Sequence, residues 1–207
     1  MAGQTLDEWA PDDLRATLLP NTLNIGEINR VLYGLPFLLE VQHLAYRADA
    51  VEEAPTSFES VQAAEARFLM PGLPRAGQRV NDVLLAQYVQ TGGRLVDADG
   101  NPALDEDALT DVLRYYEAGV RSGLFSAELV TYDSADAYWG VFSQENIPLA
   151  VVNSTTFLRN RRNLPSVAPA FLPTADGNAL VIADAWLWVL VTPNAENRMP
   201  PCASWNG

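Results

Sequence analysis

Apolar residues along the chain fall into two patterns, one with helical spacing and one with short continuous runs. The helical spacing predicts helices over residues 5–19, 80–91, 105–122 and 134–143, and another that begins after Thr56 or Ser57. The continuous runs predict extended segments at 31–37 and 41–46, in "IPLAVVNST" and in "APAFLPTADGNALVIADAWLWVLVTP". Because helices and strands alternate, the predicted fold class is α/β.

Several boundaries carry residues that typically begin or end an element. Glu59 stands where a capping box places its carboxylate, and Gly92 with Gly93 suits a left-handed helix end. Asp99 and Gly100 predict the tight turn of a short hairpin. Pro11 interrupts the first predicted helix.

The charge balance excludes some classes of partner. The chain has 26 acidic and 13 basic residues, the basic ones all Arg, for a net charge of −13. Such a chain repels phosphate backbones, so nucleic acid is not an expected partner. No apolar stretch is long enough for a membrane helix, and the polar, acidic first 20 residues show no export signal. We therefore expect no membrane insertion by this chain.

The reactive residues favour no cofactor and no metal. His43 is the only histidine, and CxxC, HExxH and glycine-rich phosphate motifs are absent from the sequence. His43 is interpreted as a strand histidine with a satisfied hydrogen bond. Close carboxylate pairs are inevitable among so many acids, so a carbohydrate-active hydrolase that uses two carboxylates stays open as an alternative function.

The tryptophans of "ADAWLWVLV" are the most informative aromatic residues. We expect Trp186 and Trp188 to point to opposite faces of a strand, one of them toward a cleft or core edge. A flat indole offers an apolar platform for a sugar ring, while nearby carboxylates and amides bond the hydroxyls. Ordinary core packing is the competing interpretation.

The order of five motifs resembles that of the family 1 extracellular solute-binding proteins of ABC importers. The resemblance runs from about Tyr33 to Arg198 and rests on these segments in sequence: "YGLPFLLEVQHLAYRADAVEEAPTSFESVQAA", "LLAQYVQTGGRLVDADGNPALDEDALTDVLRYYEAGVRSGL", "VFSQENIPLAVVNSTTF", "LPTADG" and "ADAWLWVLVTPNAENR". The sequence departs from the family at 144–148, where "GKAAM" is usual, and at Asp184 and Ala185, where the family has glycines.

The resemblance implies a type II periplasmic-binding-protein-like α/β fold, with one nearly complete lobe and pieces of the other. It places residues 1–43 in part of lobe one and the first hinge crossing, 44–182 in lobe two, and 183–207 in the return crossing and the start of a lobe-one helix. The family binds its ligand in the interlobe cleft and signals occupancy to the permease by closure. It implies no catalysis.

Carried over position by position, the resemblance implies a set of ligand-binding residues. Glu40 takes the place of a carboxylate beside the hinge, and Gln42 follows it by strand alternation. Trp186 takes the place of the stacking tryptophan. The full set is Glu40, Gln42, Asn81, Asp82, Asn153, Ser154, Phe157 and Trp186.

By resemblance, the chain is a fragment, truncated at both ends, of a protein that delivers a sugar or other small solute to ABC permease subunits. The complete protein is expected outside the cytoplasm, in the periplasm or as a membrane-anchored lipoprotein. The fragment alone is expected to bind weakly or not at all. The ending "MPPCASWNG" lacks the family's amphipathic helix, so we hypothesise a shifted reading frame there. A non-functional product of a disrupted gene is a third alternative.

Overall fold

A computed structural model describes residues 5–7, 10–19 and 22–191, so the predicted aberrant ending lies outside the described residues. The chain divides into two compact units. Unit 1 comprises Met1–Glu40 and Asp184–Gly207, and unit 2 comprises Val41–Ala183. That these units are the family's two lobes stays a prediction.

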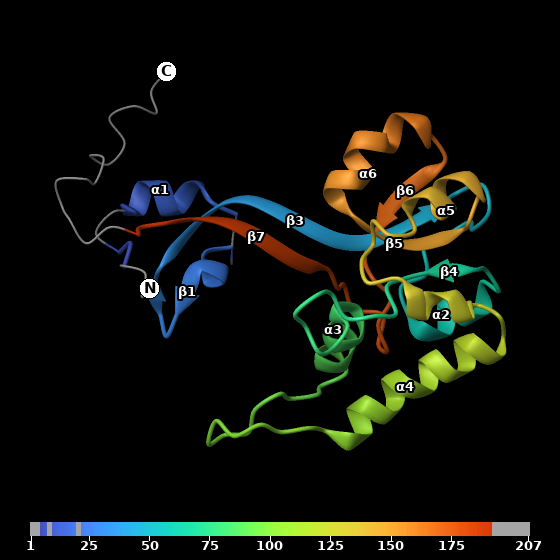
Figure 1. Cartoon of the computed structure of the whole chain (residues 1–207), viewed down its shortest axis with the longest axis horizontal. Helices are drawn as coiled ribbons and strands as arrows, with labels where there is room; N and C mark the ends of the chain where they lie inside the picture. Colours follow the sequence, from blue (N-terminus) through green and yellow to red (C-terminus); the bar gives the residue numbers. More distant parts are fainter. Residues whose placement is uncertain (1–4, 8–9, 20–21, 192–207) are drawn as a thin grey trace. The chain divides into compact units, whose positions relative to one another are not determined.

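Unit 2 is built on a mixed sheet with strand order β4-β5-β3-β6 (Figure 1). Its strands are β4 (Phe68–Leu69), β5 (Leu149–Asn153), β6 (Val167–Ala170) and the second half of β3 (Gly34–Arg47). Strand β5 runs parallel to β4 and antiparallel to β3, and β6 is also antiparallel to β3. All five residues of β5 are buried, which confirms the buried strand expected from its apolar run.

The helices of unit 2 are α2 (Phe58–Ala63), α3 (Asp82–Gln90), α4 (Glu106–Arg121), α5 (Trp139–Gln144) and α6 (Ser154–Asn160), with 3₁₀ turns η2 (Ala127–Thr131) and η3 (Arg161–Asn163). The expected helix ends are confirmed at α3 and α4, where Asn81 and Asp105 cap the N-termini and Gly92 and Gly123 follow with positive φ. The hairpin is confirmed too, because Gly100 has φ 82° and the flanking chain pairs across the turn.

The capping box of α2 differs in one partner from the sequence prediction. Ser57 is the N-cap, and the reciprocal side chain is that of Ser60 instead of Glu59. The Ser60 hydroxyl accepts from the Ser57 N–H at 2.8 Å, and the Ser57 hydroxyl accepts from the Ser60 N–H at 3.1 Å. With Ser57 as N-cap, the box position falls one residue after Glu59.

Unit 1 contains α1 (Asp12–Thr17), η1 (Leu23–Gly26), the short hairpin of β1 (Glu27–Ile28) and β2 (Val31–Leu32), the start of β3, and most of β7 (Ile182–Val189). Strand β7 pairs with β3 (Figure 1). No helix within the described ranges is long and apolar enough to cross a membrane.

Three predicted elements have different bounds in the structure. Residues 31–37 and 41–46 were expected as separate strands, but β3 continues through Pro36 from Gly34 to Arg47. The helix expected over 5–19 is reduced to α1, because Pro11 is the N-cap and starts the helix instead of interrupting it. The helix expected over 134–143 begins only at Trp139, because the residues before it form turns.

Tyr115 and Tyr138 form a natural pair for testing how hydroxyl groups affect this core. Both side chains are buried, but the Tyr138 hydroxyl donates to the Val151 carbonyl, whereas the Tyr115 hydroxyl has no partner within the described ranges. Burial raises the pKa of both phenols, so both stay neutral. The Tyr115 ring stacks on Phe58 with centroids 3.9 Å apart, a contact that Phe would preserve.

We expect opposite effects from removing these two hydroxyls. Tyr115→Phe removes an unsatisfied buried group and should leave stability unchanged or raise it by up to about 1 kcal/mol, whereas Tyr138→Phe should lower it by about 1 kcal/mol. Urea unfolding of both variants measures the difference. A larger loss for Tyr115→Phe than for Tyr138→Phe would contradict this interpretation of the core.

Candidate functional site

The chain directions in unit 2 bring several polar residues to one edge of the sheet. Because β4 and β5 are parallel, their C-terminal ends lie at the same edge, and the antiparallel β3 passes that edge at Val41 and Gln42. Ligands of α/β sheets characteristically bind outside the carboxyl ends of strands. We call the polar residues gathered at this edge, around the C-terminal end of β5, the polar cluster: Gln42, Asp136, Asn153, Ser154 and Thr156.

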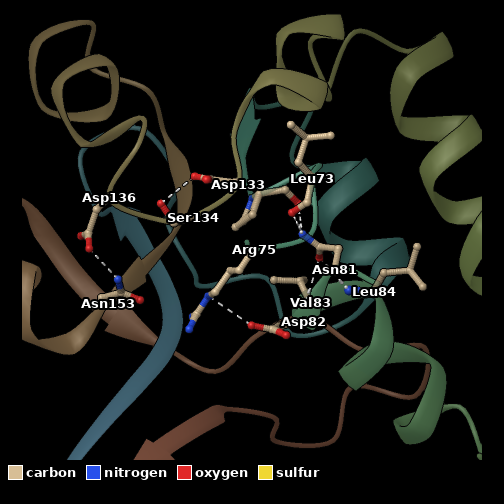
Figure 2. Close-up of polar contacts among 11 residues, drawn as sticks. Leu73, Arg75, Asn81, Asp82, Val83, Leu84, Asp133, Ser134, Asp136 and Asn153 are labelled. Carbon is tan, nitrogen blue, oxygen red and sulfur yellow. Dashed lines mark hydrogen bonds and ion pairs between the residues drawn. The ribbon is translucent and has the colours of Figure 1, made fainter. Parts of the chain in front are cut away.

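Asn153 lies at the centre of the polar cluster. It is the last residue of β5 and is only 6% exposed. Its Nδ2 donates to Oδ2 of Asp136 at 3.0 Å (Figure 2). Its own Oδ1 is buried and has no hydrogen-bond partner among the described residues. Buried polar atoms are normally hydrogen-bonded, so an orphaned oxygen calls for a ligand or water that donates to it.

Gln42 repeats the same feature on the neighbouring strand. It is 3% exposed, and its Oε1 is also buried without a partner. Gln42 is the register partner of Asn153, and directly opposed residues of an antiparallel pair share a face of the sheet. Two unpaired amide oxygens therefore lie on one face at the end of one ladder.

Ser154 and Thr156 complete the polar cluster. The Ser154 Oγ accepts from the backbone N–H of Val41 at 3.1 Å and so holds β3 against the start of α6. The Thr156 hydroxyl donates to Oδ1 of Asp136 at 2.6 Å. Asp136 and Thr156 had no sequence signal, because the partners lie 17 and 20 residues apart and the stretch around Asp136 was expected to be helical.

Asn81 and Asp82 have structural partners instead of free ligand-binding groups. The Asn81 amide donates to the carbonyls of Pro71 and Leu73 and accepts from the N–H groups of Val83 and Leu84 (Figure 2). Its hydrogen-bonding capacity is thus full. The Asp82 carboxylate lies 3.2 Å from Nε of Arg75. We therefore interpret Asn81 as a cap that holds the loop after β4, and the ligand-binding role expected for Asn81 and Asp82 stays a prediction.

Phe157, another residue of the predicted ligand-binding set, is buried against His43. It is 5% exposed and packs edge-on against His43, with ring centroids 5.2 Å apart and planes at 88°. Its expected contact with the ligand stays a prediction. The hydrogen bond expected for His43 is confirmed, since its Nδ1 lies 2.9 Å from the Leu44 carbonyl oxygen.

The buried position of His43 predicts a pH dependence of stability. Burial lowers the pKa of His43 below its ordinary value, an effect only partly offset by the hydrogen bond to Leu44. The unfolded chain therefore takes up a proton that the folded chain resists, so stability should fall as the pH drops below about 6.5 toward the folded pKa.

Replacing His43 removes the contribution of histidine to the pH dependence of stability, because the chain has no other histidine. We expect His43→Gln to reduce the loss of stability between pH 7 and pH 5 relative to the unmodified chain. Urea unfolding at four pH values measures the two slopes. Equal slopes of unfolding free energy against pH in the two proteins would show that His43 has the same pKa in the folded and unfolded chain.

Glu40 and Trp186 lie in unit 1, so their place in the predicted ligand-binding set stays a prediction. Glu40 is half-buried near the end of the unit 1 part of β3, and Trp186 is 64% exposed. The expectation that Trp186 and Trp188 point to opposite faces is wrong. Both are exposed, because residues two apart on a strand share a face, and Leu187 between them packs against Gly34.

Unit 2 also has an apolar hollow away from the polar cluster. This hollow of about 430 Å³ lies beside α3, α4 and η2, but its lining is almost entirely apolar, and it does not include the polar cluster. Within the described part of the chain, no group of three or more His, Cys, Asp or Glu residues is placed to hold a metal ion. The polar cluster is therefore our candidate site.

The architecture is that of the type II periplasmic binding proteins, and the resemblance seen in the sequence is confirmed at the level of the fold. Among solved structures, the chain is similar to maltose-bound MalE3 of T. maritima, with a TM-score of 0.70, 19% identity, and coverage of 89% of this chain and 52% of that one. It is also similar to the cyclic α-maltosyl-1,6-maltose binding protein of Arthrobacter globiformis, with a TM-score of 0.72, 19% identity, and 94% and 53% coverage.

A third similar structure is an ABC transporter solute binding protein of Thermotoga lettingae bound with α-D-tagatose, with a TM-score of 0.70, 18% identity, and 94% and 55% coverage. The chain thus spans about half the length of these structures. Neither a scan of family models nor a search of curated proteins found a match.

Proposed function

We propose that this chain is the sugar-binding part of an ABC importer's solute-binding component. One observation carries the proposal: the amide oxygens of Gln42 and Asn153 are buried, face the same side of the sheet and lack partners. Leaving a buried acceptor unsatisfied costs about 1–3 kcal/mol, so a ligand hydroxyl that donates to each would be favoured. Sugars and related polyols present neighbouring hydroxyls of this kind.

The fold supports the same ligand class. The similar structures include proteins named for maltose, cyclic maltosyl-maltose and tagatose, all of them sugars. Gln42, Asn153 and Ser154 would contact the sugar from unit 2, while the roles of Glu40 and Trp186 rest on the sequence resemblance alone. The complete protein would act outside the cytoplasm and deliver its ligand to ABC permease subunits.

We propose binding without catalysis. The similar structures are substrate-binding proteins. Nothing in the site favours the hydrolase alternative.

A titration of the ¹⁵N-labelled chain with maltose, followed by NMR, tests the proposal. Because few contacts hold the ligand, we expect a dissociation constant of about 1 mM or weaker. Signals of Gln42, Asn153 and Ser154 should shift, and Asn153→Ala should abolish the response. Asn163→Ala changes the same residue type at an exposed position after α6 and should preserve it.

The titration also has outcomes that would reject the proposal. Maltose, tagatose and raffinose at 50 mM leaving every signal unchanged would reject sugar binding by this chain. Shifts confined to residues outside the polar cluster would reject the site. Micromolar affinity would contradict our expectation that this chain alone binds weakly.

A further inference from the structure

Asp136 lies beside the candidate site and contacts Asn153 directly. Its two carboxylate oxygens accept separate hydrogen bonds, one from the Thr156 hydroxyl at 2.6 Å and one from the Asn153 amide nitrogen at 3.0 Å. Asp136 itself is exposed, whereas Asn153 is buried. The exposed carboxylate therefore holds a buried amide, with Thr156 fixing the carboxylate from the other side.

This contact decides which way the Asn153 amide points. An amide group has a donor end and an acceptor end, and an ionised carboxylate can only accept hydrogen bonds. The nitrogen of Asn153 must then face Asp136, which leaves Oδ1 as the end without a partner. A rotated amide would put two oxygens against each other, an arrangement without any hydrogen bond.

We propose that Asp136 is a positioning residue, which determines whether the Asn153 amide presents its oxygen or its nitrogen to a ligand. That the ligand is a sugar rests on the proposed function. With Asn153 held this way, the ligand must donate a hydrogen bond to Oδ1. The unpaired Oε1 of Gln42, the register partner of Asn153, can accept a hydrogen bond from a second donor on the same face. The ligand class is thus a neutral polyol that donates a hydroxyl to Oδ1 of Asn153, and groups that only accept, such as carboxylates and phosphates, are rejected at this position.

The test compares two identical chemical changes in one loop. Asp136→Asn replaces the carboxylate by an amide, which can donate as well as accept. The Asn153 side chain can then turn either its nitrogen or its oxygen toward residue 136. Asp133→Asn is the control, since that exposed carboxylate accepts a bond from its neighbour Ser134 at 3.1 Å and does not contact Asn153 in the described part of the chain. Neither substitution changes side-chain size, and urea unfolding establishes that both variants remain folded.

The first readout is the side-chain amide signal of Asn153 in the ¹⁵N-labelled chain, which needs no ligand. We expect its hydrogen exchange to be slow in the unmodified chain and in Asp133→Asn, and at least tenfold faster in Asp136→Asn. Equal exchange rates in all three proteins would overturn the positioning role. A general loss of structure would accelerate backbone amides as well, which distinguishes it from a local effect.

The second readout is maltose affinity. Losing one ligand hydrogen bond should weaken binding roughly threefold to tenfold in Asp136→Asn and leave Asp133→Asn unchanged. Equal weakening in both variants would overturn a specific role for Asp136 in binding. If maltose binds none of the three proteins while the exchange result holds, the proposed sugar function fails and the positioning of Asn153 by Asp136 stands.

Discussion

Replacing Arg47 by Met should lower the free energy of unfolding by about 3 kcal/mol, because hydrogen bonds from a charged group are worth about 1.5–3 kcal/mol each. Arg47 is only 5% exposed, although it carries a permanent charge. Its Nε donates to the Ile147 carbonyl at 3.1 Å, and its Nη2 donates to the Phe142 carbonyl at 3.0 Å. The guanidinium carbon also lies 5.3 Å from the centre of the Phe142 ring.

These contacts make Arg47 a cap for the end of α5. The Phe142 carbonyl belongs to the last turn of that helix, where carbonyls lack partners within the helix. A cation at a helix C-terminus is also favoured by the helix dipole. Methionine has similar length and leaves both buried carbonyls unsatisfied, so the substitution removes hydrogen bonds with little change in packing volume.

Arg67→Met is the matched control for this experiment. Arg67 pairs with Glu145 at 3.6 Å, but the two side chains are 49% and 55% exposed, and such surface pairs contribute less than about 1 kcal/mol. Urea unfolding at pH 7 should therefore show a large shift of the midpoint for Arg47→Met and a small one for Arg67→Met. Equal shifts would show that the buried guanidinium contributes no more than an exposed one.

A second large effect is expected at Gly72, where alanine should lower stability by about 2–3 kcal/mol, at the upper end of the usual cost of overpacking. A Cβ atom on Gly72 would lie 2.3 Å from the Leu129 carbonyl oxygen, and a backbone atom cannot rotate away as a side chain can. The chain at Gly72 is also held by a hydrogen bond from its N–H to the Tyr132 carbonyl at 3.0 Å. Alanine must therefore separate two segments of backbone.

Gly140 provides the opposite case within the same unit. It is the second residue of α5, and a Cβ atom there would meet nothing within 4 Å. Since glycine inside a helix costs about 0.5–1 kcal/mol relative to alanine, Gly140→Ala should raise stability by that amount. Thermal unfolding of the two variants should move in opposite directions. A stabilised Gly72→Ala would refute the close approach described for this loop.

The sequence predicted those elements that are determined by residues close together in the chain. The apolar run of β5 and the capping residues of α3 and α4 act over a few positions, and the structure has them where expected. Prolines were the main source of error. Pro11 begins a helix and Pro36 lies within a strand, and which role a proline takes depends on neighbours distant in the sequence.

The candidate site was only partly predictable for the same reason. Gln42 and Asn153 were expected from the family resemblance, but their pairing across the ladder depends on a register between strands more than 100 residues apart. The edge-on contact between Phe157 and His43 was not expected, because it joins residues of different elements. Asp136 lies in a turn that follows no sequence pattern, so only the folded chain brings it to Asn153.

The place of Gln42 and Asn153 at the end of the β3–β5 ladder has a consequence for how such a site could change through evolution. The next positions along the ladder, such as Leu44 and Val151, are completely buried and carry the core. Substitutions at the ladder's end alter the hydrogen bonds offered to a ligand without opening a cavity between the sheet and its helices. New ligand preferences could therefore arise from one or two mutations, while the strands beneath keep the sequence that stabilises them.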